Sequence, residues 1–159
     1  ANQYLQCARR QELIRCHHPD SPNPASVILN TGKVDIQTLG KIPDNIYAYS
    51  FVPQIEVLQH ADVFLTHCGM NSVNEAMALG VPMVAMPFIN DQLSNAKRIV
   101  ELGIGKRVRS FPSSGKQLYN AVMEVLYSYM VKERSRKIEN QLKDKYSLLK
   151  VVLAIEKLL

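Results

Sequence analysis

The feature that most constrains the fold is a regular alternation of short apolar runs and amphipathic segments in the middle of the chain. In chain order we predict a strand at 62–66, a helix at 71–79, a strand at 81–86, a helix at 91–102 and a short strand at 106–109. Gly80 and Gly103 directly follow the two helices, at the position where a left-handed glycine commonly ends a helix. Short, wholly apolar strands that alternate with helices predict an α/β fold with a parallel sheet covered by helices on both faces.

The segments on either side extend this pattern. Residues 3–16 have helical apolar spacing, and the proline-rich stretch 18–24 would end that helix. Two further strands are predicted at 27–29 and 46–52. The remainder, 113–159, is predicted to be helical, so we divide the chain into an α/β domain at 1–112 and C-terminal helices at 113–159 that pack on it and would also pack on a further half of the protein that this chain lacks.

Composition excludes several classes of protein. The chain has 159 residues, of which 47% are hydrophobic and 21% charged, so one compact domain with a real core, or two at most, is expected rather than a disordered chain. The apolar run Val151 to Ile155 is too short to span a bilayer, and the first fifteen residues, with several charges, show no signal peptide. The three cysteines form no CxxC pair, which favours reduced thiols and a cytoplasmic location.

Histidine and cysteine give little support for a metal site. Cys16-His17-His18 resembles half of such a site, but no second pair of ligands follows at the required spacing. His60, and His67 with Cys68, fail the same test. We therefore predict no metal and favour an exposed helix end at residues 16–18.

The net charge of +5 comes largely from the C-terminal helical region. Residues 130–150 carry seven Lys and Arg against three acids. A solvated helix face, with lysine stems lying on apolar neighbours, is the interpretation we favour. Contact with an anionic membrane surface is the alternative.

The loop after the strand at 62–66 carries the strongest indication of a ligand. Gly69 permits a tight turn and a close approach, and the free N–H groups of the helix that follows favour an anion such as phosphate. Asn71 and Ser72 are placed to donate hydrogen bonds to that anion. Two structural alternatives remain open: either residue is simply the N-cap of the helix, or Ser72 and Glu75 form a capping box.

The same stretch resembles the donor-binding signature of the UDP-glycosyltransferases. The matching pieces, in order and at the spacing of the family, are Phe-Val-Pro-Gln from 51, His-Cys-Gly-Met-Asn-Ser from 67, Glu75, Gly-Val-Pro from 80 and Asp-Gln from 91. Weaker similarity at 28–32 and 95–108 extends the likeness over most of the chain. The resemblance implies the C-terminal, Rossmann-like half of the GT-B architecture, similar to the bacterial macrolide-type branch.

The resemblance also implies a role for individual residues. Phe51 stands where the family usually has a tryptophan that stacks on uracil, and the Val52 backbone would bind the uracil edge. Gln54 would lie near the base and ribose, and Glu75 would accept hydrogen bonds from the ribose hydroxyls. The residues expected to hold the diphosphate are His67, Gly69, Asn71 and Ser72. Asp91 and Gln92 would bind hydroxyls of the sugar, although Asp91 also fits a helix N-cap.

The implied function is donor binding in an inverting hexosyltransferase that uses a UDP-sugar, such as UDP-glucose, as its substrate and needs no cofactor. The family places the general base in an N-terminal acceptor-binding half, so none is assigned in this chain, and we expect binding without turnover. We further expect that the first strand of the domain is absent, that the acceptor half is supplied in cis or by another chain, and that the unpaired C-terminal apolar stripe favours self-association.

The alternative is a non-enzymatic interaction module with a vestigial nucleotide-sugar site. A nucleic-acid module ranks below both, because few aromatics accompany the basic residues.

Overall fold

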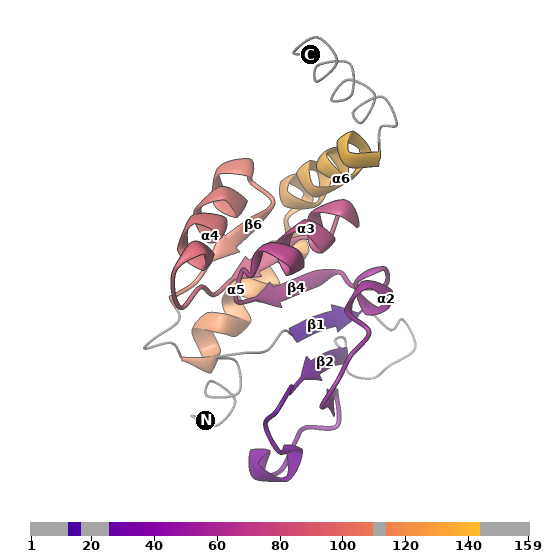
Figure 1. Ribbon diagram of the computed structural model, residues 1–159, viewed down its shortest axis with the longest axis vertical. Helices are drawn as coiled ribbons and strands as arrows, with labels where there is room; N and C mark the ends of the chain where they lie inside the picture. The colour runs from indigo at the N-terminus through magenta and orange to yellow at the C-terminus, as the bar shows by residue number, and fades with distance from the viewer. Residues whose placement is uncertain (1–12, 17–25, 110–113, 144–159) are drawn as a thin grey trace, which may run out of the picture.

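The computed structural model of the protein describes residues 13–16, 26–109 and 114–143, and strands alternate with helices from residue 26 to residue 127 (Figure 1). In chain order the elements are β1 (Leu13–Cys16), β2 (Ser26–Asn30), the short 3-10 helix η1 (Ile36–Leu39), β3 (Ile46–Tyr49), α2 (Gln54–Leu58), β4 (Val63–Thr66), α3 (Met70–Ala78), β5 (Met83–Ala85), α4 (Asp91–Leu102), β6 (Gly105–Arg107), α5 (Gly115–Tyr127) and α6 (Tyr129–Lys143). None of the helices in these ranges is long and apolar enough to cross a membrane.

The strands of the described residues form one six-stranded sheet in the order β3-β2-β1-β4-β5-β6. β2 pairs with β3 in parallel, and β4, β5 and β6 are parallel to one another. β1 runs antiparallel to both of its neighbours, β2 and β4. Because both neighbours oppose β1, the strands β2 to β6 all point the same way, and their carboxyl ends share one edge of the sheet.

The predicted helix at 3–16 is wrong where the structure describes it. Leu13–Cys16 is a strand, in which Ile14 stands opposite Ile28 on one side and Phe64 on the other. Strands β2 and β4 would otherwise each present a row of unpaired backbone N–H and C=O groups at this position, and β1 satisfies both rows. Residues 1–12 of that predicted helix, like residues 144–159, lie outside the described ranges.

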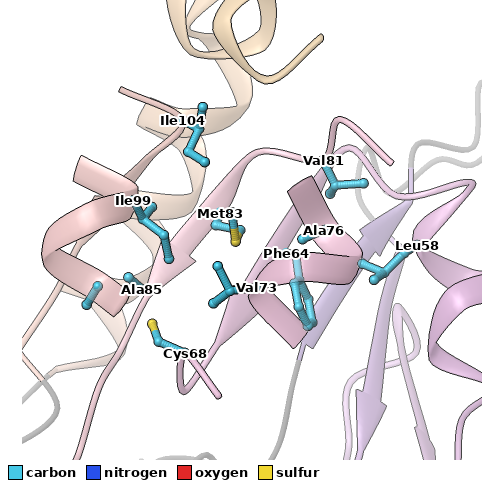
Figure 2. Packing of buried hydrophobic residues seen from close by; sticks show 11 residues of the cluster. Leu58, Phe64, Cys68, Val73, Ala76, Val81, Met83, Ala85, Ile99 and Ile104 are labelled. Carbon is cyan, nitrogen blue, oxygen red and sulfur yellow. The ribbon is translucent and has the colours of Figure 1, made fainter. Parts of the chain in front are cut away.

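The sheet is covered on both faces, as predicted. Phe64 of β4 and Met83 of β5 pack against Val73 and Ala76 of α3 and Ile99 of α4 (Figure 2). Alternate side chains of the same two strands lie in a second cluster beneath α5, formed by Val63, Leu65, Val84, Met86, Ala121, Val125 and Leu126. Since successive strand residues point to opposite faces, these wholly apolar strands form the middle layer between the helices.

Helix α6 closes the face that carries α3 and α4, and it lies beside α3 in Figure 1. The predicted helix ends at Gly80 and Gly103 are confirmed, since both residues have left-handed backbones, with φ of 66° and 67°. Both glycines also give α6 room. A Cβ atom on Gly80 would meet the carboxylate of Glu139, and one on Gly103 would meet the guanidinium of Arg134.

Helix α5 begins with a capping box that the sequence analysis missed. The Ser114 hydroxyl accepts a hydrogen bond from the Gln117 backbone N–H at 3.2 Å, and the Gln117 side chain accepts one from the Ser114 N–H at 3.0 Å. This reciprocal pair satisfies two donors that would otherwise be exposed at the helix end. The capping box fixes the residue at which α5 begins. The helix then packs on the face of the sheet opposite α3 and α4.

Candidate functional site at the carboxyl edge of the sheet

The residues predicted to bind a ligand follow three parallel strands at the shared carboxyl edge. Phe51 and Val52 follow β3, His67 and Gly69 follow β4, and Asp91 begins α4 after the loop that leaves β5. In open α/β sheets, ligands bind in the crevice at this edge. The topology therefore gathers the predicted residues although they are spread over about forty positions of the chain.

The turn between β4 and α3 is held in an unusual backbone conformation. Cys68 has φ of 69°, which is uncommon for a residue other than glycine, and its side chain is completely buried. The Cys68 N–H donates to the Thr66 hydroxyl at 3.0 Å, and the Cys68 thiol lies 3.5 Å from the Thr66 carbonyl oxygen. Such strained residues persist where the surrounding contacts fix them, and they concentrate at functional sites.

Helix α3 starts at this turn without a side-chain cap. Its N-cap is Gly69, and its first turn contains no acidic residue. Asn71 and Ser72 are inside the first turn, so the interpretation of either as the N-cap is wrong, and so is the Ser72–Glu75 capping box. Because the N-cap is a glycine, it supplies no side-chain capping bond, and the first amides of α3 together with the positive end of the helix dipole form an end that suits an anion.

His67 and Gly69 are in close contact at the same helix end. A Cβ atom on Gly69 would lie 2.8 Å from Nε2 of His67, closer than side-chain atoms normally approach. Any larger residue at 69 would therefore displace the imidazole. The glycine allows the half-buried His67 ring to lie over the beginning of α3.

Gln54, Ser72 and Glu75 form a network that joins the loop after β3 to helix α3. Nε2 of Gln54 donates to Oε2 of Glu75 at 2.6 Å and to Oγ of Ser72 at 3.2 Å. All three side chains are half-buried. The contact holds one oxygen of the Glu75 carboxylate in place, and Oε1 remains available to accept hydrogen bonds from a ligand. The sequence analysis assigned these residues to one site but did not foresee this bond between two of them.

Phe51 and Val52 face opposite environments in the loop after β3. The Phe51 ring is 78% exposed, whereas the Val52 side chain is buried at 5%. The role of Val52 through its backbone stays a prediction, since the burial concerns only its side chain. An exposed aromatic ring at this edge of the sheet offers a flat apolar face for a base.

Asp91 and Gln92 begin helix α4 at the same edge. The alternative of Asp91 as a helix cap is wrong, because Asn90 is the N-cap and makes no side-chain capping bond. The Gln92 side-chain oxygen accepts from the backbone N–H groups of Phe88 at 2.9 Å and Ile89 at 3.3 Å. Gln92 thus stabilises its own loop through its oxygen, which leaves its N–H₂ group for a ligand, while the Asp91 side chain is exposed.

One residue at this edge was missed by the sequence analysis. Asn95 is only 9% exposed, and its Nδ2 atom lies 2.9 Å from the Cys68 carbonyl oxygen and 3.4 Å from Oδ2 of Asp91. A polar residue on the buried side of α4, next to Ala96 and one turn before Ile99, was the available signal. Buried side-chain amides are normally hydrogen-bonded, so such a residue has a specific partner.

Nothing in the described ranges forms a cluster of three or more His, Cys, Asp or Glu side chains arranged to hold a metal. The interpretation of residues 16–18 as a helix end is wrong at Cys16, which is the last residue of strand β1, and His17 and His18 lie outside the described ranges.

Comparison with known proteins identifies the relatives of this chain. A family model described as "UDP-glucoronosyl and UDP-glucosyl transferase" matches residues 24–148. The chain is 36% identical over 137 residues to the uncharacterized UDP-glucosyltransferase YdhE of Bacillus subtilis, covering 86% of this chain and 35% of that protein. It is 37% identical over 119 residues to the NDP-glycosyltransferase YjiC of the same organism, covering 74% of this chain and 30% of that protein.

The fold is similar to that of a solved glycosyltransferase. The crystal structure of CalG4, the calicheamicin glycosyltransferase, aligns with a TM-score of 0.77 and 27% identity, over 98% of this chain and 39% of that chain. The predicted family and its α/β architecture are thereby confirmed. The chain spans about a third of the length of the curated relatives it matches.

Proposed function

The chain belongs to the UDP-glycosyltransferase family, and we propose that it supplies the donor-binding site of an enzyme that transfers a hexose from a UDP-sugar to a small-molecule acceptor. The observation that carries this proposal is the beginning of α3. An uncapped helix end, preceded by a strained turn and flanked by His67, is arranged to receive a diphosphate.

We assign the parts of the donor to the residues around the diphosphate. The exposed Phe51 ring stacks on the uracil, and the Val52 backbone bonds its edge. Glu75, with one carboxylate oxygen held by Gln54, accepts from the ribose hydroxyls. The sugar lies near Asp91 and the free N–H₂ group of Gln92.

The chemistry follows from charge development on the leaving group. Displacement of UDP from the anomeric carbon by the acceptor oxygen, with inversion, places negative charge on the departing diphosphate. The α3 amides, Asn71, Ser72 and His67 stabilise that charge in the transition state more than in the ground state, which is the condition for catalysis.

The length of the relatives indicates where the acceptor would bind. Because the chain corresponds to about a third of their length, we propose that the acceptor site and the base that deprotonates the acceptor belong to a part outside this chain. The isolated chain then binds donor without turnover. We assign the chain no cofactor, since the UDP-sugar is its substrate. We also propose the cytoplasmic location expected from its cysteine content.

Saturation-transfer NMR with UDP-glucose tests the proposal. We expect ligand signals for the intact chain, and we expect them to disappear in Glu75→Ala because the ribose loses a charged acceptor. Glu56→Ala on α2 is the matched control, since Glu56 is exposed and lies outside the network; its signals should be unchanged.

Absence of ligand signals for the unaltered, folded chain would overturn the proposal in favour of a vestigial site. Equal signals for the unaltered chain and Glu75→Ala would overturn the role of Glu75.

A further inference from the structure

We propose that Asn95 is a positioning residue that couples the diphosphate-binding turn to the sugar-binding residue Asp91. This inference rests on the proposed function and extends it to a side chain that is buried behind the site. Asn95 belongs to α4, whereas the turn it contacts precedes α3, so the coupling crosses 27 positions of the chain.

The first step is the orientation of the peptide bond between Cys68 and Gly69. A trans peptide is planar, so its C=O and N–H groups point in opposite directions. Asn95 donates to the Cys68 oxygen from the interior, at 2.9 Å. The Gly69 N–H is therefore directed away from Asn95, and it is the amide that immediately precedes the uncapped end of α3.

The second step is the pair of contacts that fixes Cys68 in its left-handed conformation. The peptide before Cys68 is held because its N–H donates to the Thr66 hydroxyl at 3.0 Å. The peptide after Cys68 is held by Asn95. With both flanking peptides fixed, the strained residue at φ of 69° cannot relax without breaking a buried hydrogen bond.

The third step is the link to Asp91. The Asn95 amide has two hydrogens on one nitrogen, and its second acceptor is Oδ2 of Asp91, one helical turn earlier, at 3.4 Å. The side-chain amide of asparagine carries two donors, so one neutral group can bond a carbonyl and a carboxylate together. The amide thereby fixes the distance between the group that binds the diphosphate and the group that binds the sugar.

Asn95→Asp is the sharpest test, because it keeps the shape of the side chain and replaces both donors with acceptors. The Cys68 oxygen and the Asp91 carboxylate would then both repel residue 95. We expect affinity for UDP to fall about tenfold or more, and affinity for uridine to change less than about twofold. Ser94→Ala, an exposed neighbour on α4, is the matched control and should bind both ligands normally.

Calorimetric titration of UDP and uridine into each variant measures these affinities, with thermal unfolding to verify the fold. A purely structural role for Asn95 would weaken UDP and uridine to the same extent, and that result would overturn the inference. An unchanged affinity for UDP in a folded Asn95→Asp variant would overturn it as well. If the unaltered chain bound no UDP, the proposed function itself would fail, which is a distinguishable result.

A measurement on the unaltered chain covers the case in which the variant does not fold. In proton–nitrogen NMR spectra, UDP should shift both the Gly69 amide and the Asn95 side-chain amide resonances, whereas uridine should leave them in place. Resonances of Asn95 that do not respond to saturating UDP would contradict the coupling.

Discussion

At the scale of single residues, the site depends on side chains that hold one another before any ligand arrives. Gln54 restrains the carboxylate of Glu75, and Gly69 is small enough to leave room for the His67 ring. Each contact removes rotational freedom that the ligand would otherwise have to restrict on binding. The roles of His67 and Phe51 are separable by experiment, because one is placed at the diphosphate and the other at the base.

His67→Ala should weaken UDP about tenfold or more and leave uridine nearly unaffected. The imidazole lies at the helix end where the diphosphate is expected, and a hydrogen bond to a charged group contributes about 1.5–3 kcal/mol. Calorimetry with the two ligands separates the contribution of His67 to diphosphate binding from any contribution to nucleoside binding. Equal losses for UDP and uridine would refute the diphosphate assignment; His60→Ala, at an exposed histidine, is the control.

Phe51→Ala should weaken UDP and uridine equally, because both ligands carry the base. Stacking of a base on an aromatic ring contributes about 1–3 kcal/mol, and Phe51→Trp, with a larger face, should strengthen both. The measurement is the same pair of titrations. A loss for UDP alone, or no change in either variant, would remove Phe51 from the base site.

At the scale of secondary-structure elements, the two helices that bear the site are fixed at their far ends by α6. Gly80 ends α3 and Gly103 ends α4, and each admits a side chain of α6. The residues at the N-terminal ends of α3 and α4 therefore belong to helices whose opposite ends are packed against side chains of α6. This arrangement assigns a stabilising role to residues that no ligand touches.

Gly103→Ala should lower the free energy of unfolding by about 1–2 kcal/mol. The substitution places a Cβ on a left-handed residue and displaces Arg134 from the end of α4. Gly115→Ala is the control, since Gly115 is in the first turn of α5 with nothing within 4 Å of its added Cβ, and it should be neutral or slightly stabilising.

Urea unfolding of the two variants beside the unaltered chain measures both effects. A Gly103→Ala variant as stable as Gly115→Ala would show that the close contact with α6 is not maintained in solution.

At the scale of the whole molecule, local patterns were sufficient to predict the α/β order, the strands around β4 and β5, and the helix ends at Gly80 and Gly103. The features that were missed depend on contacts between distant segments. β1 is a strand because β2 and β4 lie on either side of it, and Gln54 meets Glu75 across 21 positions. Helix α3 begins at Met70, one residue before the predicted start at Asn71. This start depends on the left-handed backbone of Cys68, which the apolar pattern of the sequence does not reveal.

The central claim is that the beginning of α3 binds the diphosphate of a uridine nucleotide. Titration calorimetry of UDP into the folded chain, with uridine as the reference ligand, tests it most directly. We predict saturable binding of UDP with clearly higher affinity than uridine. No saturable heat at millimolar UDP, from protein whose NMR spectrum shows a folded sheet, would contradict the claim.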